Sequence, residues 1–327
     1  MAKTAFLTRA YNAAAYLPES AGSVLAQTDG DFLYFLCDNG STDGTREQIL
    51  ALAAQDSRVV PVLLDENSPM ESMNLLLCRV YASGCRYFAV LDADDTYDPG
   101  FHAEAVSALQ RTGAGLFLCG SRFFSGEDAC GERRFPGDIA LERPDFGAWF
   151  ARLHVFLRAY WAKLFDLRVL RDPPLLLSRE LFYGSDTIFA LEAFARCSRL
   201  ALSGRVLHAY RMHGASDTHH LSPGRFHDDV RQRELTAALV RQNGWETREN
   251  RLFLDRVFLN ACADTATLSL YERDRDALLA EIFTSPALRE AWEALEAASA
   301  GWAERSRLAR VAAAARIAAE QTKGGSS

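Results

Sequence analysis

The sequence has no apolar run long enough to cross a membrane. Its longest uninterrupted apolar segments are six residues, as in Ile49–Ala54, whereas a membrane-spanning helix needs about 18. The opening residues, Met1–Arg9, are also too short and too soon charged for a secretory signal. These absences favour a cytoplasmic protein.

Paired cysteines are missing too. The seven cysteines, at positions 37, 78, 85, 119, 130, 197 and 262, are odd in number and include no C-x-x-C spacing. Several of them fall inside apolar strand or helix patterns, which predicts buried, reduced thiols. The pattern suggests neither a disulfide framework nor a zinc site.

An excess of positive charge is also absent. The formal net charge is −7, whereas a nucleic-acid partner would require a basic face. The hydrophobic content of 49% and charged content of 24% are those of an ordinary soluble globule. With 327 residues, the chain can form one large domain with an appendage, or two domains.

What the sequence does contain, in its first part, is an alternation of short apolar runs and helical segments. Strands are expected at residues 5–8, 33–37, 59–64, 87–91 and 115–119, with helices at 17–26, 45–54, 71–82 and 99–111. This alternation predicts a mostly parallel sheet, with Pro61 marking the third strand as one near an edge. Ligands bind beyond the carboxyl ends of such strands, where Tyr11, Asp38–Asn39 and Asp92–Asp94 fall.

The later sequence is less regular and then becomes all-helical. We expect loops or short strands at 121–144, a helix at 145–160, a turn or short strand at 161–165, a helix from 183 to 197, strands at 200–202 and 206–211, and helices at 225–241, 251–270, 273–283 and 286–322. The change at Pro223-Gly224 divides the chain into a first domain, residues 1–222, and a helical C-terminal extension, residues 223–327.

Three carboxylates, Asp92, Asp94 and Asp95, follow the apolar strand at 87–91. Like charges this close repel one another, so some of them would have to protonate. A divalent cation removes that cost, because hard cations prefer carboxylate oxygens and phosphates can complete the shell. The alternative is an acidic turn that caps the helix beginning near Pro99.

Six short motifs, in this order, resemble those of the family 2 glycosyltransferases of GT-A fold. They are Ala10-Tyr11-Asn12, Asp38-Asn39-Gly40-Ser41-Thr42-Asp43-Gly44-Thr45, Asp92-Ala93-Asp94-Asp95, Lys163-Leu164-Phe165, Tyr183-Gly184-Ser185-Asp186-Thr187 and Tyr210-Arg211-Met212-His213. The resemblance covers roughly residues 3–217 and leaves out the helical tail.

The resemblance implies an α/β fold of GT-A type, with a Rossmann-like, mostly parallel sheet flanked by helices. The nucleotide-sugar half would span about residues 1–125 and the acceptor half about 126–222. The implied activity is an inverting, metal-dependent transfer of a sugar from a UDP-sugar donor to a hydroxyl on a glycan, lipid-linked or surface-polymer acceptor.

The resemblance also implies a site for Mn²⁺ or Mg²⁺. Asp94 would be the direct metal ligand, and Asp92 would reach the ribose or a metal-bound water. His213 lies where many members of the family complete the metal shell. Its alternative is a histidine satisfied by structural hydrogen bonds near a strand end.

Donor binding is implied for residues at three strand ends. Tyr11 would lie flat on the uracil ring, with a core tyrosine as the alternative, and Thr8 and Ala93 would join it. The base N3–H needs an acceptor, which Asp38 or Asn39 can supply. Two aspartates are usual where this chain has Asp38-Asn39, which changes the contact with uracil. Many members have Arg-Asn where it has Met73-Asn74, which removes one polar contact near the donor.

Asp186 matches the general base of the family. Members have Glu-Asp where this chain has Ser185-Asp186, so the base is retained and its acidic neighbour is not. At a helix N-terminus the helix dipole would keep the carboxylate ionised, although a simple helix cap is the alternative. Lys163 and Arg211 are the candidates for contact with the acceptor or a phosphate, and a solvated lysine is the alternative for Lys163.

Two other functions compete with this interpretation. One is a non-catalytic nucleotide-sugar-binding or scaffold protein that has kept the pocket. The other is a nucleotidyltransferase of related topology, which would need a glycine-rich phosphate loop where Thr8–Asn12 contains no glycine.

The end of the chain is basic and rich in alanine. It carries Arg305, Arg307, Arg310, Arg316 and Lys323. A basic amphipathic helix can lie on an anionic membrane surface, which would place the enzyme as a peripheral protein at the inner face of the membrane. The alternative is that this helix packs on its own domain.

Overall fold

The computed structural model describes residues 3–214, 221–222, 224–272, 275–299, 306–307, 309–310 and 312–313. The chain forms two compact units. The first contains residues 1–146, 153–179 and 185–213, and the second contains residues 147–152, 180–184 and 214–327. In the described part of the chain, no helix combines the length and apolar character needed to cross a bilayer.

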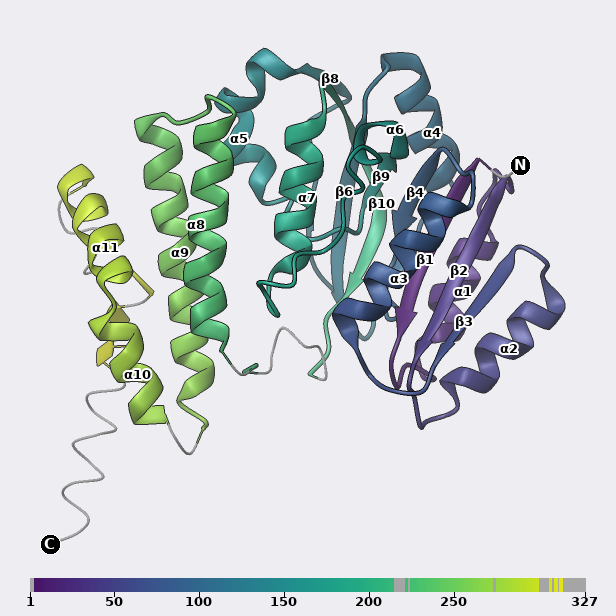
Figure 1. Cartoon of the computed structure of the whole chain (residues 1–327), viewed down its shortest axis with the longest axis horizontal. Coiled ribbons are helices and arrows are strands. Elements are labelled where there is room, and N and C mark those ends of the chain that lie inside the picture. The colour runs from purple at the N-terminus through teal and green to yellow at the C-terminus, as the bar shows by residue number, and fades with distance from the viewer. Residues whose placement is uncertain are drawn as a thin grey trace, which may run out of the picture. The chain divides into compact units, whose positions relative to one another are not determined.

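The first unit begins with the predicted strand–helix alternation. The strands β1 (Thr4–Ala10), β2 (Phe32–Asn39), β3 (Val59–Leu64) and β4 (Tyr87–Val90) are parallel neighbours in the order β3-β2-β1-β4. The helices between them are α1 (Leu17–Leu25), α2 (Thr45–Gln55) and α3 (Pro69–Ala82), and Figure 1 shows α2 and α3 lying along these strands. Pro61 lies in the edge strand β3, as predicted.

The sheet continues past β4 through an antiparallel strand, where the sequence predicts a turn or short strand. β9 (Lys163–Asp166) lies between β4 and β6 (Leu116–Ser125) and is antiparallel to both. β10 (Arg199–Arg211) then pairs in parallel with β6. The smaller strands are β5 (Thr96–Tyr97), β7 (Asp128–Arg133) and β8 (Ile139–Glu142). The predicted fold class, a mostly parallel sheet flanked by helices, is confirmed.

Two predictions of local structure need correction. The helix expected over 145–160 consists of a 3-10 turn, η1 (Arg143–Asp145), and α5 (Phe146–His154), which ends early; the Val155 carbonyl just beyond it accepts a hydrogen bond from Arg133. The strands expected at 200–202 and 206–211 are one strand, β10, with irregular pairing between Leu202 and Val206. The remaining helices of this part are α4 (Phe101–Thr112), α6 (Leu167–Leu170) and α7 (Ser185–Arg196).

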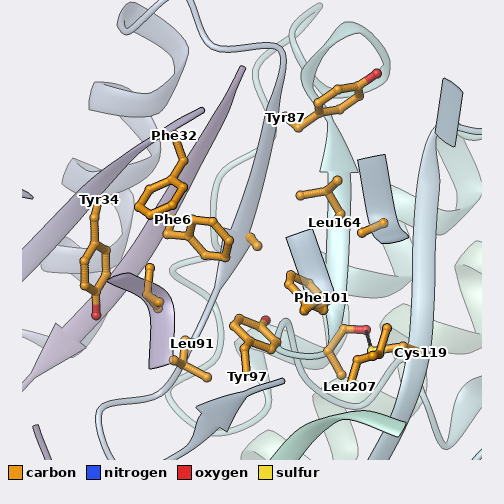
Figure 2. Close-up of a cluster of buried hydrophobic side chains, with 14 of the residues drawn as sticks. Phe6, Phe32, Tyr34, Tyr87, Leu91, Tyr97, Phe101, Cys119, Leu164 and Leu207 are labelled. Atoms are coloured by element: carbon orange, nitrogen blue, oxygen red, sulfur yellow. Dashed lines mark hydrogen bonds between the residues drawn. The ribbon is translucent and has the colours of Figure 1, made fainter. Parts of the chain in front are cut away.

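Aromatic side chains on alternate strand positions form the core of the first unit (Figure 2). Phe6 meets Phe32 edge to face at 5.1 Å, and Tyr97 stacks on Phe101 at 3.8 Å. Because side chains alternate across a strand, Phe88 faces the opposite side, where its ring lies 6.4 Å from that of Phe189 in α7. Both faces of the sheet centre are therefore buried, and burial of each such ring contributes about 1.5–3 kcal/mol.

The second unit is helical beyond Gly224. It contains α8 (Arg225–Gln242), α9 (Arg248–Ser269), α10 (Arg275–Thr284) and α11 (Pro286–Ala298), so the predicted helical extension is confirmed where it is described. Its core is formed by the following side chains: Phe226, Phe258, Leu259, Cys262, Ile282, Leu288, Ala291 and Leu295. Of the five basic tail residues, Arg305, Arg316 and Lys323 lie outside the described residues, as do most of residues 301–327.

All seven cysteines are free thiols. Cys37, Cys85, Cys119, Cys197 and Cys262 are buried, whereas Cys78 and Cys130 are exposed. Five of the seven are buried, as the apolar patterns around them predicted.

Candidate active site

Three parallel strands bring the predicted donor residues to one edge of the sheet. β1 is the central strand, because Thr4 pairs with Phe32 of β2 and with Tyr87 of β4. Tyr11 follows β1 and is 46% exposed, so its ring is available for a flat contact with a base. The core-tyrosine alternative for Tyr11 is excluded.

The loop after β2 is tied to the loop after β1. The Asn12 N–H donates to Ser41 Oγ (3.0 Å), and the Asn12 side chain accepts from the Thr42 N–H (2.9 Å). The Ala13 and Ala14 amides donate to Thr45 Oγ1 and Asp43 Oδ2. The Gly40–Thr45 turn therefore fixes the backbone on which Tyr11 is presented.

The side chains of Asp38 and Asn39 are already bonded within the protein. Asp38 is fully buried; it accepts from the Ser41 N–H and pairs with Arg46 Nε at 2.6 Å. Asn39 is 1% exposed and hydrogen-bonds to Asn67 and to the Ser68 N–H. A base contact by either side chain stays a prediction, and it would require these bonds to exchange.

Thr8 is likewise committed to the interior. It is fully buried, and its hydroxyl accepts a hydrogen bond from the Tyr34 hydroxyl (2.9 Å). A side-chain contact between Thr8 and a donor would therefore break an internal bond.

The acidic turn after β4 is electrostatically costly, as its sequence suggested. Burial, and then the Asp95 and Asp94 carboxylates, raise the pKa of Asp92 well above its ordinary value. Burial, and then Asp94, do the same to the pKa of Asp95. A positive charge placed here would relieve both effects.

Asp94 meets His213 at this turn. Asp94 Oδ2 and His213 Nε2 lie 2.7 Å apart, although 119 residues separate them in the sequence. The His213 ring stacks on Tyr16, with centroids 4.9 Å apart, and among the described residues its Nδ1 has no hydrogen-bond partner. A carboxylate oxygen and an imidazole nitrogen that converge in this way fit a divalent cation.

The carboxylates of the acidic turn have different partners. Among the described residues, no group of three His, Cys, Asp or Glu side chains is arranged to hold a metal ion. Asp95 turns instead toward β10, where its Oδ1 accepts from the Arg211 N–H (2.8 Å) and its Oδ2 lies 3.2 Å from His208 Nε2. A cation at Asp94 and His213 would therefore take further ligands from phosphate or water.

Arg211 links the end of β10 to the acidic turn after β4. Its Nε donates to the Asp94 carbonyl (2.9 Å), and its guanidinium also pairs with Glu19. These bonds explain why β10 delivers His213 to Asp94. Contact of Arg211 with the acceptor or a phosphate stays a prediction, because its guanidinium already has two partners.

Asp186 lies in the first turn of α7 and is partly exposed. Its Oδ1 accepts a hydrogen bond from the Thr187 N–H (2.7 Å). Burial raises its pKa, although this bond and the charges of Arg158 and Lys163 oppose the shift. Burial therefore opposes the ionised form that the helix end favours, and it makes the carboxylate a stronger base once ionised.

Lys163 is a buried residue of β9. It is 1% exposed, and its ammonium donates to the Trp161 carbonyl (3.0 Å). Burial, and then the Arg133 guanidinium, lower its pKa to about 7, whereas the Asp186 carboxylate acts in the opposite direction. The alternative of a solvated lysine is wrong.

Sequence reasoning missed several members of the site. Trp161 stacks on His208 at 4.6 Å, and His208 Nδ1 lies 3.2 Å from Ser121 Oγ. Burial, and then the charges of Lys163 and Arg133, lower the pKa of His208 to about 3. None of these residues lies in a recognisable motif; an isolated histidine between apolar strand residues was the one available signal.

Comparison with known proteins identifies relatives of the chain. Residues 6–151 match a family model described as glycosyl transferase family 2. An uncharacterized glycosyltransferase of Haemophilus influenzae is 27% identical over 218 residues, which are 63% of this chain and 64% of that protein. The chain thus spans a little under two thirds of the length of this relative.

Solved structures share the fold over nearly the whole chain. S. aureus TarS in complex with UDP has a TM-score of 0.63 at 16% identity, and the match covers 97% of this chain and 92% of TarS. A mannosyltransferase from Pyrobaculum calidifontis, in complex with GDP-Man and Mn²⁺, has a TM-score of 0.55 at 14% identity, covering 95% of this chain and 86% of that one.

Proposed function

We propose that this chain, whose residues 6–151 match the family model glycosyl transferase family 2, is an inverting, metal-dependent glycosyltransferase that uses a UDP-sugar. The observation that carries the proposal is the 2.7 Å approach of His213 to Asp94 at the carboxyl edge of the sheet. Two potential metal-ligating atoms, from distant parts of the chain, meet at the sheet edge where nucleotide ligands of such folds bind.

The choice of UDP rests on Tyr11 and on the fold. TarS, which shares the fold, binds UDP, and the exposed Tyr11 ring offers a flat surface for a pyrimidine. The P. calidifontis enzyme binds GDP-Man, so the fold accepts other bases. The test below therefore compares UDP-sugars with GDP-sugars.

Asp94 and His213 are the residues that would hold the cation, with Asp92 reaching toward the ribose. When bound, a divalent cation would offset the negative charge of the departing nucleoside diphosphate. Arg211 lies two residues before His213, and it donates hydrogen bonds to the Asp94 carbonyl and to the Asp95 carboxylate. These bonds keep the segment that carries His213 beside the turn that carries Asp94.

Asp186 would act on the acceptor. Its carboxylate takes the proton of the acceptor hydroxyl while that oxygen bonds to the anomeric carbon, and the bond from this carbon to the diphosphate oxygen breaks. Attack opposite the leaving group inverts the anomeric configuration. The acceptor would be a glycan or a lipid-linked saccharide at the cytoplasmic side.

The test follows nucleotide release from a panel of UDP- and GDP-sugars with Mn²⁺, and again with EDTA. We expect release with one or more UDP-sugars in Mn²⁺, none in EDTA, and none from Asp94→Ala. The matched control is Asp128→Ala, which removes an exposed carboxylate of β7 and should retain activity.

Two outcomes would overturn the proposal. Donor binding without any turnover or slow hydrolysis would favour the non-catalytic binding protein. Release of pyrophosphate from UTP and a sugar 1-phosphate would identify a nucleotidyltransferase.

A further inference from the structure

Two cationic side chains act electrostatically on Asp186, and a third acts on one of these two; among the described residues, none of the three has a carboxylate partner. They are Arg133 at the end of β7, Arg158 after α5, and Lys163 in β9. Among the described residues, no Asp or Glu oxygen comes within 4.0 Å of their charged nitrogens. Elsewhere in the first unit, buried Asp38 and Asp166 both pair with arginines.

The Arg133 guanidinium is enclosed by aromatic rings. Its central carbon lies 5.2 Å from the ring centre of Phe123 and 5.5 Å from those of Phe156 and Trp161. Its Nη1 donates to the Val155 carbonyl (2.7 Å), but its Nε, which is buried, has no hydrogen-bond partner among the described residues. A buried charge with unused donors is costly unless a ligand completes it.

The cations also repel one another. Burial, and then the charge of Arg158, lower the pKa of Arg133 to about 10, and Arg133 in turn lowers that of Lys163. Asp186 is the carboxylate whose charge acts on Lys163, and both Arg158 and Lys163 act on Asp186. Two positive charges thus act on the carboxylate of the proposed general base, and the third, Arg133, acts on Lys163 and is itself influenced by Arg158.

We propose that the acceptor carries an anionic group, a phosphate or a carboxylate, beside the hydroxyl that reacts, and that Arg133 binds this group with support from Arg158 and Lys163. The inference rests on the proposed function, because it assigns Asp186 to the acceptor. An anion here would accept charge-assisted hydrogen bonds from the unused N–H groups of the Arg133 guanidinium. It also removes the repulsion among the cations.

Trp161 fits the same acceptor. Its ring is partly exposed, and it is held by stacking on His208. Its exposed part lies next to the Arg133 cation, so it can contact a sugar that carries an anionic substituent.

The test measures binding of three small probes to the whole protein, with UDP and Mn²⁺ present, by calorimetry or NMR. The probes are glycerol 3-phosphate, methyl glucuronide and the neutral methyl glucoside. We expect one or both anionic probes to bind at least about tenfold more tightly than the neutral one, and the difference between them identifies the anion. Arg133→Gln should remove this preference.

The matched control is Arg122→Gln. Arg133 pairs with Ser121 across the β6–β7 ladder, so the exposed Arg122 points to the opposite face while the change in net charge is the same. This control should keep the preference. Arg158→Gln provides a second test if Arg133→Gln does not fold. Arg158 is exposed, and its replacement should weaken anion binding about threefold or more.

Equal binding of charged and neutral probes would overturn the inference. A loss of UDP affinity in Arg133→Gln would also overturn it, because the cations would then belong to the donor site.

UDP affinity of the wild type is measured separately. If UDP does not bind at all, the proposed function fails, whereas selective binding of the anionic probes would still support the cation site.

Discussion

The buried ammonium of Lys163 makes folding stability depend on pH. Burial, and then the charge of Arg133, lower the pKa of Lys163 from 10.5 to about 7 in the folded protein. Between these two values the unfolded chain holds a proton that the folded chain lacks, so raising the pH favours the folded state. From pH 7.0 to 9.5 this linkage amounts to roughly 3 kcal/mol.

Lys163→Met removes the titrating group while keeping a long side chain. Measured by urea unfolding, the stability of Lys163→Met relative to the wild type should therefore fall by roughly 3 kcal/mol between pH 7.0 and 9.5. The matched control is Leu164→Met, a change at the adjacent, fully buried position of β9, where volume is nearly conserved. Its stability relative to the wild type should not vary with pH.

A direct titration gives the second measurement. The chain has three lysines, Lys3, Lys163 and Lys323, so ¹³C-lysine NMR yields few signals, and the one lost in Lys163→Met identifies the residue. We expect its midpoint near pH 7. A midpoint near the ordinary lysine value of about 10.4, or a stability difference that does not change with pH, would refute the reasoning.

Three further predictions concern the proposed mechanism and the tail. Asp186→Asn should lower kcat by ~10²–10⁴-fold, because a general base is lost, with UDP affinity nearly unchanged and NMR of the wild-type product showing inversion; near-normal kcat or retention would remove Asp186 from the mechanism. UDP with Mn²⁺ should raise Tm in the wild type, because both bind the native state, and this gain should disappear in Asp94→Ala but persist in Asp128→Ala. Deletion of residues 301–327 should reduce co-sedimentation with anionic liposomes; equal binding of both proteins would refute membrane contact by the tail.

The motifs that end β1, β2 and β4 could be placed from the sequence. Each follows a short apolar run, and parallel neighbours bring their carboxyl ends to the same edge. Tyr11, Asp92 and Asp94 were therefore located by pattern alone. His213 needed the family resemblance, because 119 residues separate it from Asp94 and no periodicity spans that distance.

The sequence could not predict which carboxylate of the acidic turn contacts which partner. Asp94 and Asp95 are adjacent and chemically alike, yet Asp94 faces His213 while Asp95 accepts from the Arg211 backbone and lies beside His208. That choice depends on where β10 lies, and β10 is placed by its pairing with β6 and β5. The same long-range pairing determines which carboxylate is free for a ligand.

The burial of Lys163 is the clearest case of a property that arises from topology. A lysine in a short run beside a tryptophan resembles an exposed strand end, but β9 lies between β4 and β6 and so places Lys163 inside the sheet. Its low pKa then has a consequence for ligand binding. An anion bound by Arg133 would stabilise the charged form of Lys163. Near neutral pH, an anionic acceptor would therefore bind together with a proton that Lys163 takes up. The negative charge of the acceptor would offset part of the cost of burying the Lys163 ammonium.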